Sequence, residues 1–396
     1  MADAPTVPRD RLVSLDAYRG LAMVLMLGEA LHLREVASHL PGSGVWQFLG
    51  FHQSHVEWAG CSIHDLIQPS FTFMVGVSLP FSIAARTSRG QSLKWMTLHA
   101  FWRAAVLVLL GIFLRSLGKD QTNFTFEDTL TQIGLGYGFL FLIGLRPMRD
   151  QVIALVLILA GYWGAFALFP LPGTGFDWSQ AGVAANWPHH FQGFAAHWNK
   201  NTNLAWSFDR WFLNLFPRDQ PFLFNGGGYA TLSFLPTLGT MILGLLAGGI
   251  LRGKGGSGRK FGMLIAAAAF CFAAGLALHY TGVCPIVKRI WTPAWVLFSG
   301  GWCFTLLAAF YAVIDGAGWK WWSFPLVVVG MNSIVAYCLE WGAVSFVSRA
   351  LVRHFGEAPW VVFGAAYRPV TLGAATLILL WLVLLWMHRR QVYVRI

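Results

Sequence analysis

The sequence predicts an all-α polytopic membrane protein. Hydrophobic residues make up 56% of its 396 residues and charged residues only 11%, whereas a soluble protein carries roughly a quarter charged residues. Apolar runs of about 20 residues, the length that spans a bilayer as a helix, recur along the whole chain. Twenty Trp and 32 Phe add side chains suited to a bilayer and its interfaces. So many long apolar runs do not fit inside one water-soluble core.

About ten of these segments are expected to cross the membrane as helices. They start near Ser14, Ile63, Trp95, Asp128, Gln151, Tyr229, Phe261, Pro293, Pro325 and Val370. A long loop, 171–228, separates the fifth helix from the sixth, and 349–367 is expected to be a loop with an interfacial helix around 360–363. The two halves show no repeat of the kind that many transporters carry. Residues 1–396 are therefore taken as one transmembrane domain.

Positive charge in the short loops predicts that both termini are cytoplasmic. In this orientation the inner segments hold Arg9, Arg11, Arg86, Arg89, Lys94, Arg146, Arg149, Arg252, Lys254, Arg259, Lys260, Lys320, Arg389, Arg390 and Arg395. The outer short loops hold fewer: Arg34, Arg115, Lys119, Lys288, Arg289, Arg349, Arg353 and Arg368. The long loop is exempt from this count. It then faces outside, as does the polar stretch 51–64.

The net charge of +11 does not indicate a nucleic-acid partner. Lys and Arg lie singly or in pairs at the ends of apolar runs, which is typical of loops that set topology in a lipid bilayer. The five cysteines have no CxxC spacing and predict neither a disulfide framework nor a metal site, although one Cys61–Cys284 bridge stays open. The N-terminal MADAPTVPRDR leads into the first apolar run without a clean cleavage site, so we expect an uncleaved helix.

Two glycine-rich stretches invite a nucleotide-binding interpretation that we reject. GKGGSGRK approaches a P-loop, but Gly255 stands where Ser or Thr is required and no strand precedes it. GLGYG at 134–138 lies inside an apolar run, where small residues favour a close-packing helix face.

The first predicted helix carries Asp16, Arg19, Glu29 and His32 in or beside its apolar span. A charged group at mid-bilayer costs on the order of 3 kcal/mol, so these side chains should face protein or a water-filled cavity. Asp16 and Arg19 are three apart and share a helix face, which favours an ion pair near the inner surface, either structural or supporting a site. Glu29, near the outer end, either joins a site with His55 or is a buried structural carboxylate.

The polar stretch before the second predicted helix is the candidate chemical centre, because it carries His52, His55 and His64. A zinc site is weakly indicated, since HxxH on a loop has no Cys partner, and no metal is expected. His52 and His64 are interpreted as ordinary interfacial histidines. His55 differs because Trp58 and Asp65 follow it. A neutral His there can take a proton from an attacking amine or hydroxyl, or carry an acyl group itself.

Six motifs in order resemble the heparan-α-glucosaminide N-acetyltransferase family and its bacterial homologues. RLVSLDAYRGLAMVLM resembles the R-L-x-S-x-D-x-x-R-G start, and HVEWAGCSIHDLIQP resembles H-x-x-W-x-G-x-x-x-x-D-L-x-x-P. LTQIGLGY and FDRWFLN follow, then CPIVKRIWTPAW, similar to P-I-x-K-x-x-W, and GMNSIVAY, similar to G-M-N-S-I. Together they cover nearly the whole chain, and their joint order is far more specific than any one of them.

The resemblance implies a transmembrane acetyltransferase that moves acetyl from cytosolic acetyl-CoA to an amino sugar or other saccharide on the far side of a membrane. Its catalytic histidine falls on His55, as base or as acetyl carrier. Ala30 stands where the family has an assisting Asn, so either Glu29 takes over that role or the acceptor chemistry differs. FNGGGYATLSFLP replaces an acidic D-P-x-G turn, and LTQI replaces L-Q-R-I.

Other polar side chains are expected to support the reaction. The thioester oxyanion needs a hydrogen-bond donor, for which Trp58, Lys288, Asn332 and Ser333 are the candidates. Asn332 and Ser333 interrupt an apolar helix, and their alternative role is to hold helices together. Asp209 and Arg210 lie in HWNKNTNLAWSFDRWF, whose aromatic and amide groups suit a sugar surface, although aromatic residues are also ordinary at a bilayer interface.

Two functions of different classes stay open. The first is acetyl transfer in a bacterial inner membrane, with N- and O-acetylation, and direct and ping-pong routes, as alternatives. The second is a transporter or flippase for a small molecule or lipid-linked glycan that uses the same pathway without chemistry. A homodimer is compatible with either function.

Overall fold

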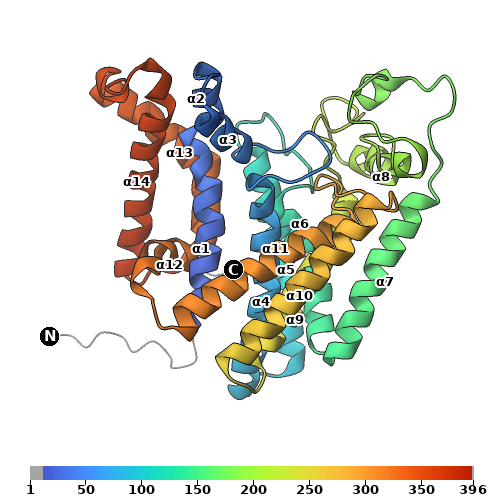
Figure 1. Ribbon diagram of the computed structural model, residues 1–396, viewed down its shortest axis with the longest axis horizontal. Helices are drawn as coiled ribbons and strands as arrows, with labels where there is room; N and C mark the ends of the chain where they lie inside the picture. The colour runs from blue at the N-terminus through green and yellow to red at the C-terminus, as the bar shows by residue number, and fades with distance from the viewer. Residues whose placement is uncertain (1–11, 395–396) are drawn as a thin grey trace. The chain divides into compact units, whose positions relative to one another are not determined.

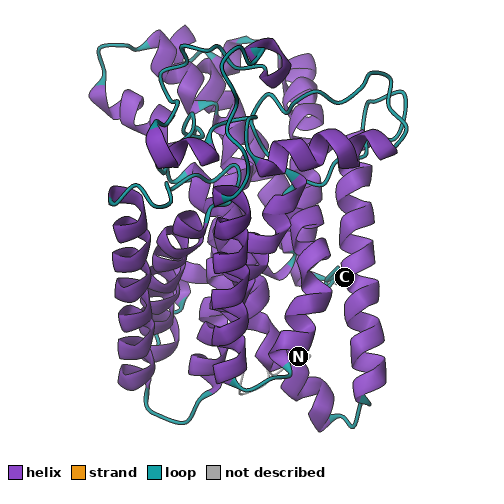
Figure 2. Ribbon diagram, turned by 90° about the vertical axis from the view of Figure 1, so that its right-hand side faces the viewer, coloured by secondary structure: helices purple, strands orange, loops and turns teal. Residues whose placement is uncertain are grey.

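The computed structural model describes residues 12–394, which are helical apart from loops and turns, with no strand drawn among them (Figure 2). The α-helices are α1 (Val13–Leu27), α2 (Leu33–His39), α3 (Gly44–His52), α4 (Ile67–Ser88), α5 (Leu93–Ser116), α6 (Thr129–Gly144), α7 (Met148–Ala167), α8 (Leu204–Phe212), α9 (Phe234–Arg252), α10 (Ser257–Tyr280), α11 (Pro293–Phe310), α12 (Phe324–Met331), α13 (Ser333–Phe355) and α14 (Arg368–Arg389).

Short helical turns join these helices. They are η1 (Gly28–Leu31), η2 (His64–Leu66), η3 (Trp178–Ala181), η4 (Gly193–Trp198), η5 (Leu213–Leu215), η6 (Thr231–Ser233), η7 (Tyr311–Gly316), η8 (Trp321–Ser323), η9 (Ala358–Trp360) and η10 (Ala365–Tyr367). All are 3-10 turns except η7, which is a π-helix continuing α11.

Within residues 12–394, eight helices are long and apolar enough to cross a membrane: His64–Ser88, Leu93–Ser116, Met148–Ala167, Thr231–Arg252, Ser257–Tyr280, Pro293–Gly316, Ser333–Phe355 and Ala365–Arg389. Thr129–Gly144 and Trp321–Met331 are apolar but shorter. The protein is therefore an integral membrane protein with an all-α polytopic fold, as its composition predicts.

An α-helix begins close to each of the ten predicted starts, and the largest offset separates the predicted Tyr229 from the observed Phe234. The helix expected from Pro325 is broken, however, because α12 ends at Met331 and α13 starts at Ser333. The prediction of a loop over 349–367 was wrong for its first part, since α13 continues to Phe355. The predicted charges Arg9, Arg11 and Arg395, and the N-terminal segment, lie outside the described residues.

The described chain groups into two compact units. Unit 1 consists of residues up to Leu31, Gly255–Ile265 and Thr305–Arg395, and unit 2 of His32–Lys254 and Ala266–Phe304. The prediction of one domain over the whole chain stays a prediction. Each unit has its own internal packing.

In unit 1, α1, α12 and α14 lie side by side (Figure 1). The first N–H groups of a helix lack partners within it. At the start of α1 the Asp315 carboxylate supplies them, because it accepts the backbone N–H groups of Val13 and Ser14 at 3.2 and 3.1 Å. A Cβ on Gly330 of α12 would collide with the Asp16 carbonyl oxygen. The small residue thus lets α1 and α12 approach closely.

In unit 2, α9 is the central helix, with α4, α6 and α7 packed against it. α4 and α9 touch backbone to backbone, because a Cβ on Gly76 would collide with the Met241 carbonyl oxygen and one on Gly244 with the Phe73 carbonyl oxygen. The GLGYG run packs α6 on α5, with a Cβ on Gly134 falling 2.7 Å from the Ala104 carbonyl oxygen. This confirms the interpretation of that run as a close-packing face.

Candidate functional site

The candidate site starts from the loop between α3 and α4, which Asp65 holds closed. Asp65, 1% exposed, lies in the turn η2 that leads into α4. Its Oδ2 accepts the backbone N–H of Ser62 at 3.0 Å and of Val56 at 3.3 Å. Its Oδ1 lies 2.8 Å from Nδ1 of His55. One carboxylate therefore fixes the loop and orients the histidine ring.

A second loop, between α10 and α11, brings a buried lysine to the same place. Ala59 and Val287 form an isolated antiparallel bridge, and Gly60 donates its N–H to the Ile286 carbonyl oxygen at 3.1 Å. Lys288 follows directly, 4% exposed. Its Nζ lies 3.1 Å from Nδ1 of His55 and 3.4 Å from Oδ1 of Asp65.

A third segment, the glycine turn after residue 224, reaches the site through Arg289. The Arg289 guanidinium donates to the carbonyl oxygens of Gly227 at 2.7 Å and of Val56 at 3.1 Å, and lies 5.3 Å from the centre of the Tyr229 ring. The Tyr229 ring centre is 6.4 Å from that of His55. Three segments far apart in the chain thus converge around one imidazole.

The electrostatic surroundings of His55 act on its pKa in opposite directions. Burial among its neighbours lowers the pKa of His55 below its usual value, the hydrogen bond to Asp65 raises it, and the Lys288 charge lowers it again, with a net decrease. Burial also lowers the pKa of Lys288, against the attraction of Asp65. A ring that is still 36% exposed is thereby kept neutral to a lower pH than a free histidine.

This arrangement equips His55 to act as a base or as a nucleophile. If Nδ1–H donates to Asp65, the other ring nitrogen, Nε2, carries a free lone pair, as in hydrolytic sites where a carboxylate sets the histidine tautomer. Proton transfer to a positioned histidine accelerates reactions by roughly 10²–10⁴. The chemistry available here is proton abstraction from, or acyl transfer to, a group that approaches Nε2.

The predicted supporting residue Trp58 belongs to the loop between α3 and α4 and points into the protein. It is 1% exposed, and its Nε1–H donates to the Trp198 carbonyl oxygen at 3.1 Å. A Cβ on Gly228 would stand 2.7 Å from its ring. Because its indole N–H is already used, the Trp58 side chain supports the loop rather than offering a donor to a reacting group.

Asp209 and Arg210 lie on α8, in the long loop of unit 2. Asp209 is 2% exposed, and its Oδ2 accepts the Thr231 N–H at 2.9 Å. Burial raises the pKa of Asp209 to about 7. The Arg210 guanidinium stacks on the Trp206 ring, 4.9 Å from its centre.

The remaining predicted residues belong to unit 1. Asp16 and Arg19 form the expected ion pair at 3.6 Å. Glu29 lies on η1 with an exposed side chain, and its partnership with His55 stays a prediction. The Asn332 amide donates to the Val392 carbonyl oxygen at 3.1 Å and accepts the Val394 N–H at 3.2 Å. These contacts favour a structural role at the break before Ser333, the first residue of α13.

The other histidines and cysteines of the segment have local roles. The His52 Nδ1 accepts the Ile63 N–H at 3.2 Å, and the His64 ring lies 4.5 Å from that of His55. Cys61 and Cys284 are free thiols, so the bridge left open above is not formed. Between residues 12 and 394, no group of three or more His, Cys, Asp or Glu side chains is arranged to hold a metal ion.

Comparison of the sequence with known proteins gives two similar proteins of the same name. The chain is 26% identical over 371 residues to human heparan-alpha-glucosaminide N-acetyltransferase. It resembles the heparan-alpha-glucosaminide N-acetyltransferase family over 83% of its length. The mouse protein of the same name gives 26% identity over 370 residues. The chain spans about half the length of these relatives, 52% and 53%. No family model matches the chain.

Tyr229 and Arg289 were not predicted from the sequence, although both contribute to the surroundings of His55. Arg289 was counted only as a loop charge. Its position directly after Lys288, in the CPIVKRIW motif, was the available signal. Tyr229 follows three glycines, and nothing local indicates that this turn folds against the histidine loop.

Proposed function

We propose that the protein is a transmembrane acetyltransferase that moves the acetyl group of acetyl-CoA to an amino or hydroxyl group of a saccharide. The observation that carries this proposal is the contact of His55 with Asp65 and Lys288, at 2.8 and 3.1 Å from Nδ1. The similarity to an N-acetyltransferase supports the reaction class. The bacterial inner membrane is the proposed location.

In the proposed reaction, Nε2 of His55 takes a proton as the acceptor nitrogen or oxygen attacks the thioester carbon. The carbon–sulfur bond then breaks, the electron pair leaves on the CoA sulfur, and the imidazolium returns its proton to that thiolate. Asp65 holds the tautomer and stabilises the imidazolium, as a carboxylate does beside a catalytic histidine. The ping-pong alternative forms acetyl-His55 first, with Nε2 as the nucleophile.

The role proposed here for Lys288 differs from that of a hydrogen-bond donor to the thioester oxyanion, for which the sequence made it a candidate. Its Nζ lies against Nδ1, on the side of the ring away from Nε2, where the acceptor reacts. We assign it a positioning role: its charge balances the buried Asp65 carboxylate, and its proximity to Nδ1 opposes protonation of the ring. A buried carboxylate without such a partner is strongly disfavoured.

For the donor, we propose that the nucleotide of acetyl-CoA stays beside the cationic ends of α4 and α5. Arg86 contacts the His99 ring at 3.3 Å and the Gln91 amide at 3.5 Å. Arg103, which lies further inside α5, ten residues after its first residue Leu93, contacts the Tyr137 hydroxyl at 3.2 Å. These contacts join both cations to neutral groups, which leaves their charge available to phosphates.

The test is CoA release from labelled acetyl-CoA by the purified protein with glucosamine as acceptor. Replacing His55 by Ala should lower kcat/KM by a factor of about 10²–10⁴. His39→Ala is the matched control, since His39 is an exposed histidine at the end of α2 in the same unit. It should keep the wild-type rate.

The same assay separates the enzyme from the transporter. Uptake of labelled saccharide into vesicles without CoA release would favour transport and contradict the proposal. CoA release that persists in the His55→Ala protein would keep the reaction class but remove His55 as its base.

A further inference from the structure

The hydroxyl group of Tyr229 is a polar group beside His55 that the fold leaves uncommitted. The two rings meet nearly edge to face, with their centres 6.4 Å apart and their planes at 69°. The backbone N–H of Tyr229 donates to Oδ1 of Asn225 at 3.3 Å, whereas its hydroxyl forms no hydrogen bond with any residue that the structure describes. The O–H of a buried tyrosine usually finds a partner, and this side chain is half-buried. The hydroxyl therefore calls for a partner that binds from outside the chain.

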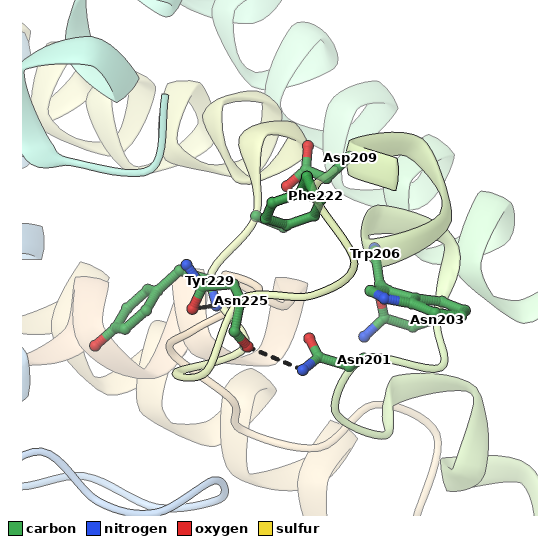
Figure 3. A pocket seen from close by; sticks show the side chains of 9 residues that line it. Asn201, Asn203, Trp206, Asp209, Phe222, Asn225 and Tyr229 are labelled. Atoms are coloured by element: carbon green, nitrogen blue, oxygen red, sulfur yellow. Dashed lines mark hydrogen bonds between the residues drawn. The ribbon is translucent and has the colours of Figure 1, made fainter. Parts of the chain in front are cut away.

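The Tyr229 ring is held in place although its hydroxyl is not. Oδ1 of Asn225 also accepts the Gly227 N–H at 2.8 Å, which fixes the turn before the ring. The Arg289 guanidinium lies 5.3 Å from the ring centre and donates to the Gly227 carbonyl oxygen at 2.7 Å. In Figure 3 the ring points away from Asn201, whose amide donates to the Asn225 carbonyl oxygen at 2.9 Å, and the hydroxyl is at its far end. A fixed ring with an open hydroxyl is a preorganised hydrogen-bond donor.

The proposed reaction needs such a donor. As the acceptor attacks, the carbonyl oxygen of the thioester gains negative charge, and a donor aimed at that oxygen stabilises the transition state. The sequence candidates in unit 2 are committed, because the Trp58 N–H donates to the Trp198 carbonyl oxygen and the Lys288 Nζ lies against the imidazole Nδ1. Burial raises the pKa of Tyr229, against the Arg289 charge, to about 12. At neutral pH its hydroxyl is therefore protonated and can donate.

We propose that the Tyr229 hydroxyl donates a hydrogen bond to the carbonyl oxygen of the thioester while Nε2 of His55 takes the proton of the acceptor. This rests on the proposed function. Asp65 and Lys288 occupy the Nδ1 edge of the imidazole, so the thioester reacts at the opposite edge. The phenol keeps its proton throughout. It stabilises the oxyanion until the electron pair returns to the carbonyl group and the carbon–sulfur bond breaks. The same donor serves the acetylation of Nε2 in the ping-pong route.

The first test is Tyr229→Phe, assayed by CoA release from labelled acetyl-CoA with glucosamine as acceptor. Phe keeps the ring against His55 and Arg289 and removes only the hydroxyl. We expect kcat to fall by a factor of about 10²–10³, the usual cost of losing one oxyanion donor, with both KM values unchanged. Tyr280→Phe is the matched control, since Tyr280 is 81% exposed at the end of α10, and it should keep the wild-type kcat.

A second variant separates hydrogen-bond donation from a structural role. Tyr229→difluorotyrosine, with fluorine on both ring carbons beside the hydroxyl, nearly keeps the shape of tyrosine but ionises at much lower pH. Its ionisation is read from its ultraviolet absorbance. A phenolate cannot donate, so kcat should fall as the phenol ionises, in a basic limb well below the pKa of about 12 of Tyr229. Tyr280→difluorotyrosine should keep the wild-type pH profile.

These results distinguish failure of the donor from failure of the proposed function. CoA release with an undiminished kcat in Tyr229→Phe, or with no loss of kcat as the fluorinated phenol ionises, keeps acetyl transfer and overturns Tyr229 as the donor. The second criterion holds even if Tyr229→Phe fails to fold, which its thermal unfolding midpoint would show. Absence of CoA release by the wild-type protein removes the proposed function, and the role of Tyr229 with it.

Discussion

His55 lies between two opposite charges, Asp65 and Lys288, which shift its pKa in opposite directions. Lys288 and Asp65 both lie within 3.1 Å of Nδ1. Burial and Lys288 lower the pKa of His55, and Asp65 raises it. A base with a lower pKa is unprotonated, and so active, over a wider pH range, but it binds the transferred proton less firmly. The opposing effects of Asp65 and Lys288 therefore balance the pH range of His55 against its strength as a base.

Substitution of these neighbours should therefore move the acid limb of the pH profile of kcat/KM in opposite directions. Lys288→Met removes a charge that lowers the pKa of His55, so the limb moves to higher pH. Asp65→Asn removes the contacts that raise this pKa, so the limb moves to lower pH, and the lost tautomer control lowers kcat by about 10²–10⁴. The profiles are measured by CoA release. Shifts in the same direction would contradict the assigned geometry.

At the scale of elements, α9 organises unit 2 because glycines let α4 approach it. Gly244 faces the Phe73 carbonyl oxygen without room for a Cβ. Since α4 starts two residues after Asp65, any displacement of α4 also displaces the carboxylate that orients His55.

Gly244→Val should consequently destabilise the protein by about 1–3 kcal/mol or more, as overpacking does, and lower activity through α4. The measurement is the thermal unfolding midpoint in detergent. Gly161→Ala in α7 is the control, because a Cβ there meets nothing within 4 Å. That variant should match the wild type or exceed it, since Ala favours helix. Equal stability of both variants would argue against the α4–α9 contact.

The sequence predicted the long helices, but not the partners of the break at Asn332 or the short helices α2 and α3, and each outcome has a physical reason. Long apolar runs identify helices because length and hydropathy alone decide insertion, which is why the ten starts were found. The break at Asn332 was recognised as a polar interruption, but its partners Val392 and Val394 lie about sixty residues away. The helices α2 and α3 are too short to give such a signal.

The candidate site was predictable in part. Asp65 lies ten residues from His55, near enough for the local sequence to suggest their contact. Lys288 is 233 residues away, and only the resemblance marked its segment. Its place against Nδ1, like those of Arg289 and Tyr229, depends on the folding of two loops onto a third, which no periodicity encodes.

At the scale of the whole molecule, the proposed function requires the long loop and the loop that follows α9 to face opposite sides of the membrane. In intact cells, a membrane-impermeant maleimide should label Thr174→Cys, in the long loop, and leave Ser257→Cys, at the start of α10, unlabelled. Both positions are exposed, so detergent should make both react. Labelling of Ser257→Cys alone in intact cells would reverse the predicted orientation.

The bridge between Ala59 and Val287 has a consequence for biosynthesis. Ribosomes add roughly 5–20 residues per second, so about 10–50 s separate the synthesis of His55 from that of Lys288, 233 residues later. During this time Asp65, in the turn that leads into α4, has no Lys288 beside it. The nascent chain therefore passes through a period in which a carboxylate that is 1% exposed in the folded protein lacks its lysine partner. Anything that slows translation between α4 and α11 lengthens that exposure.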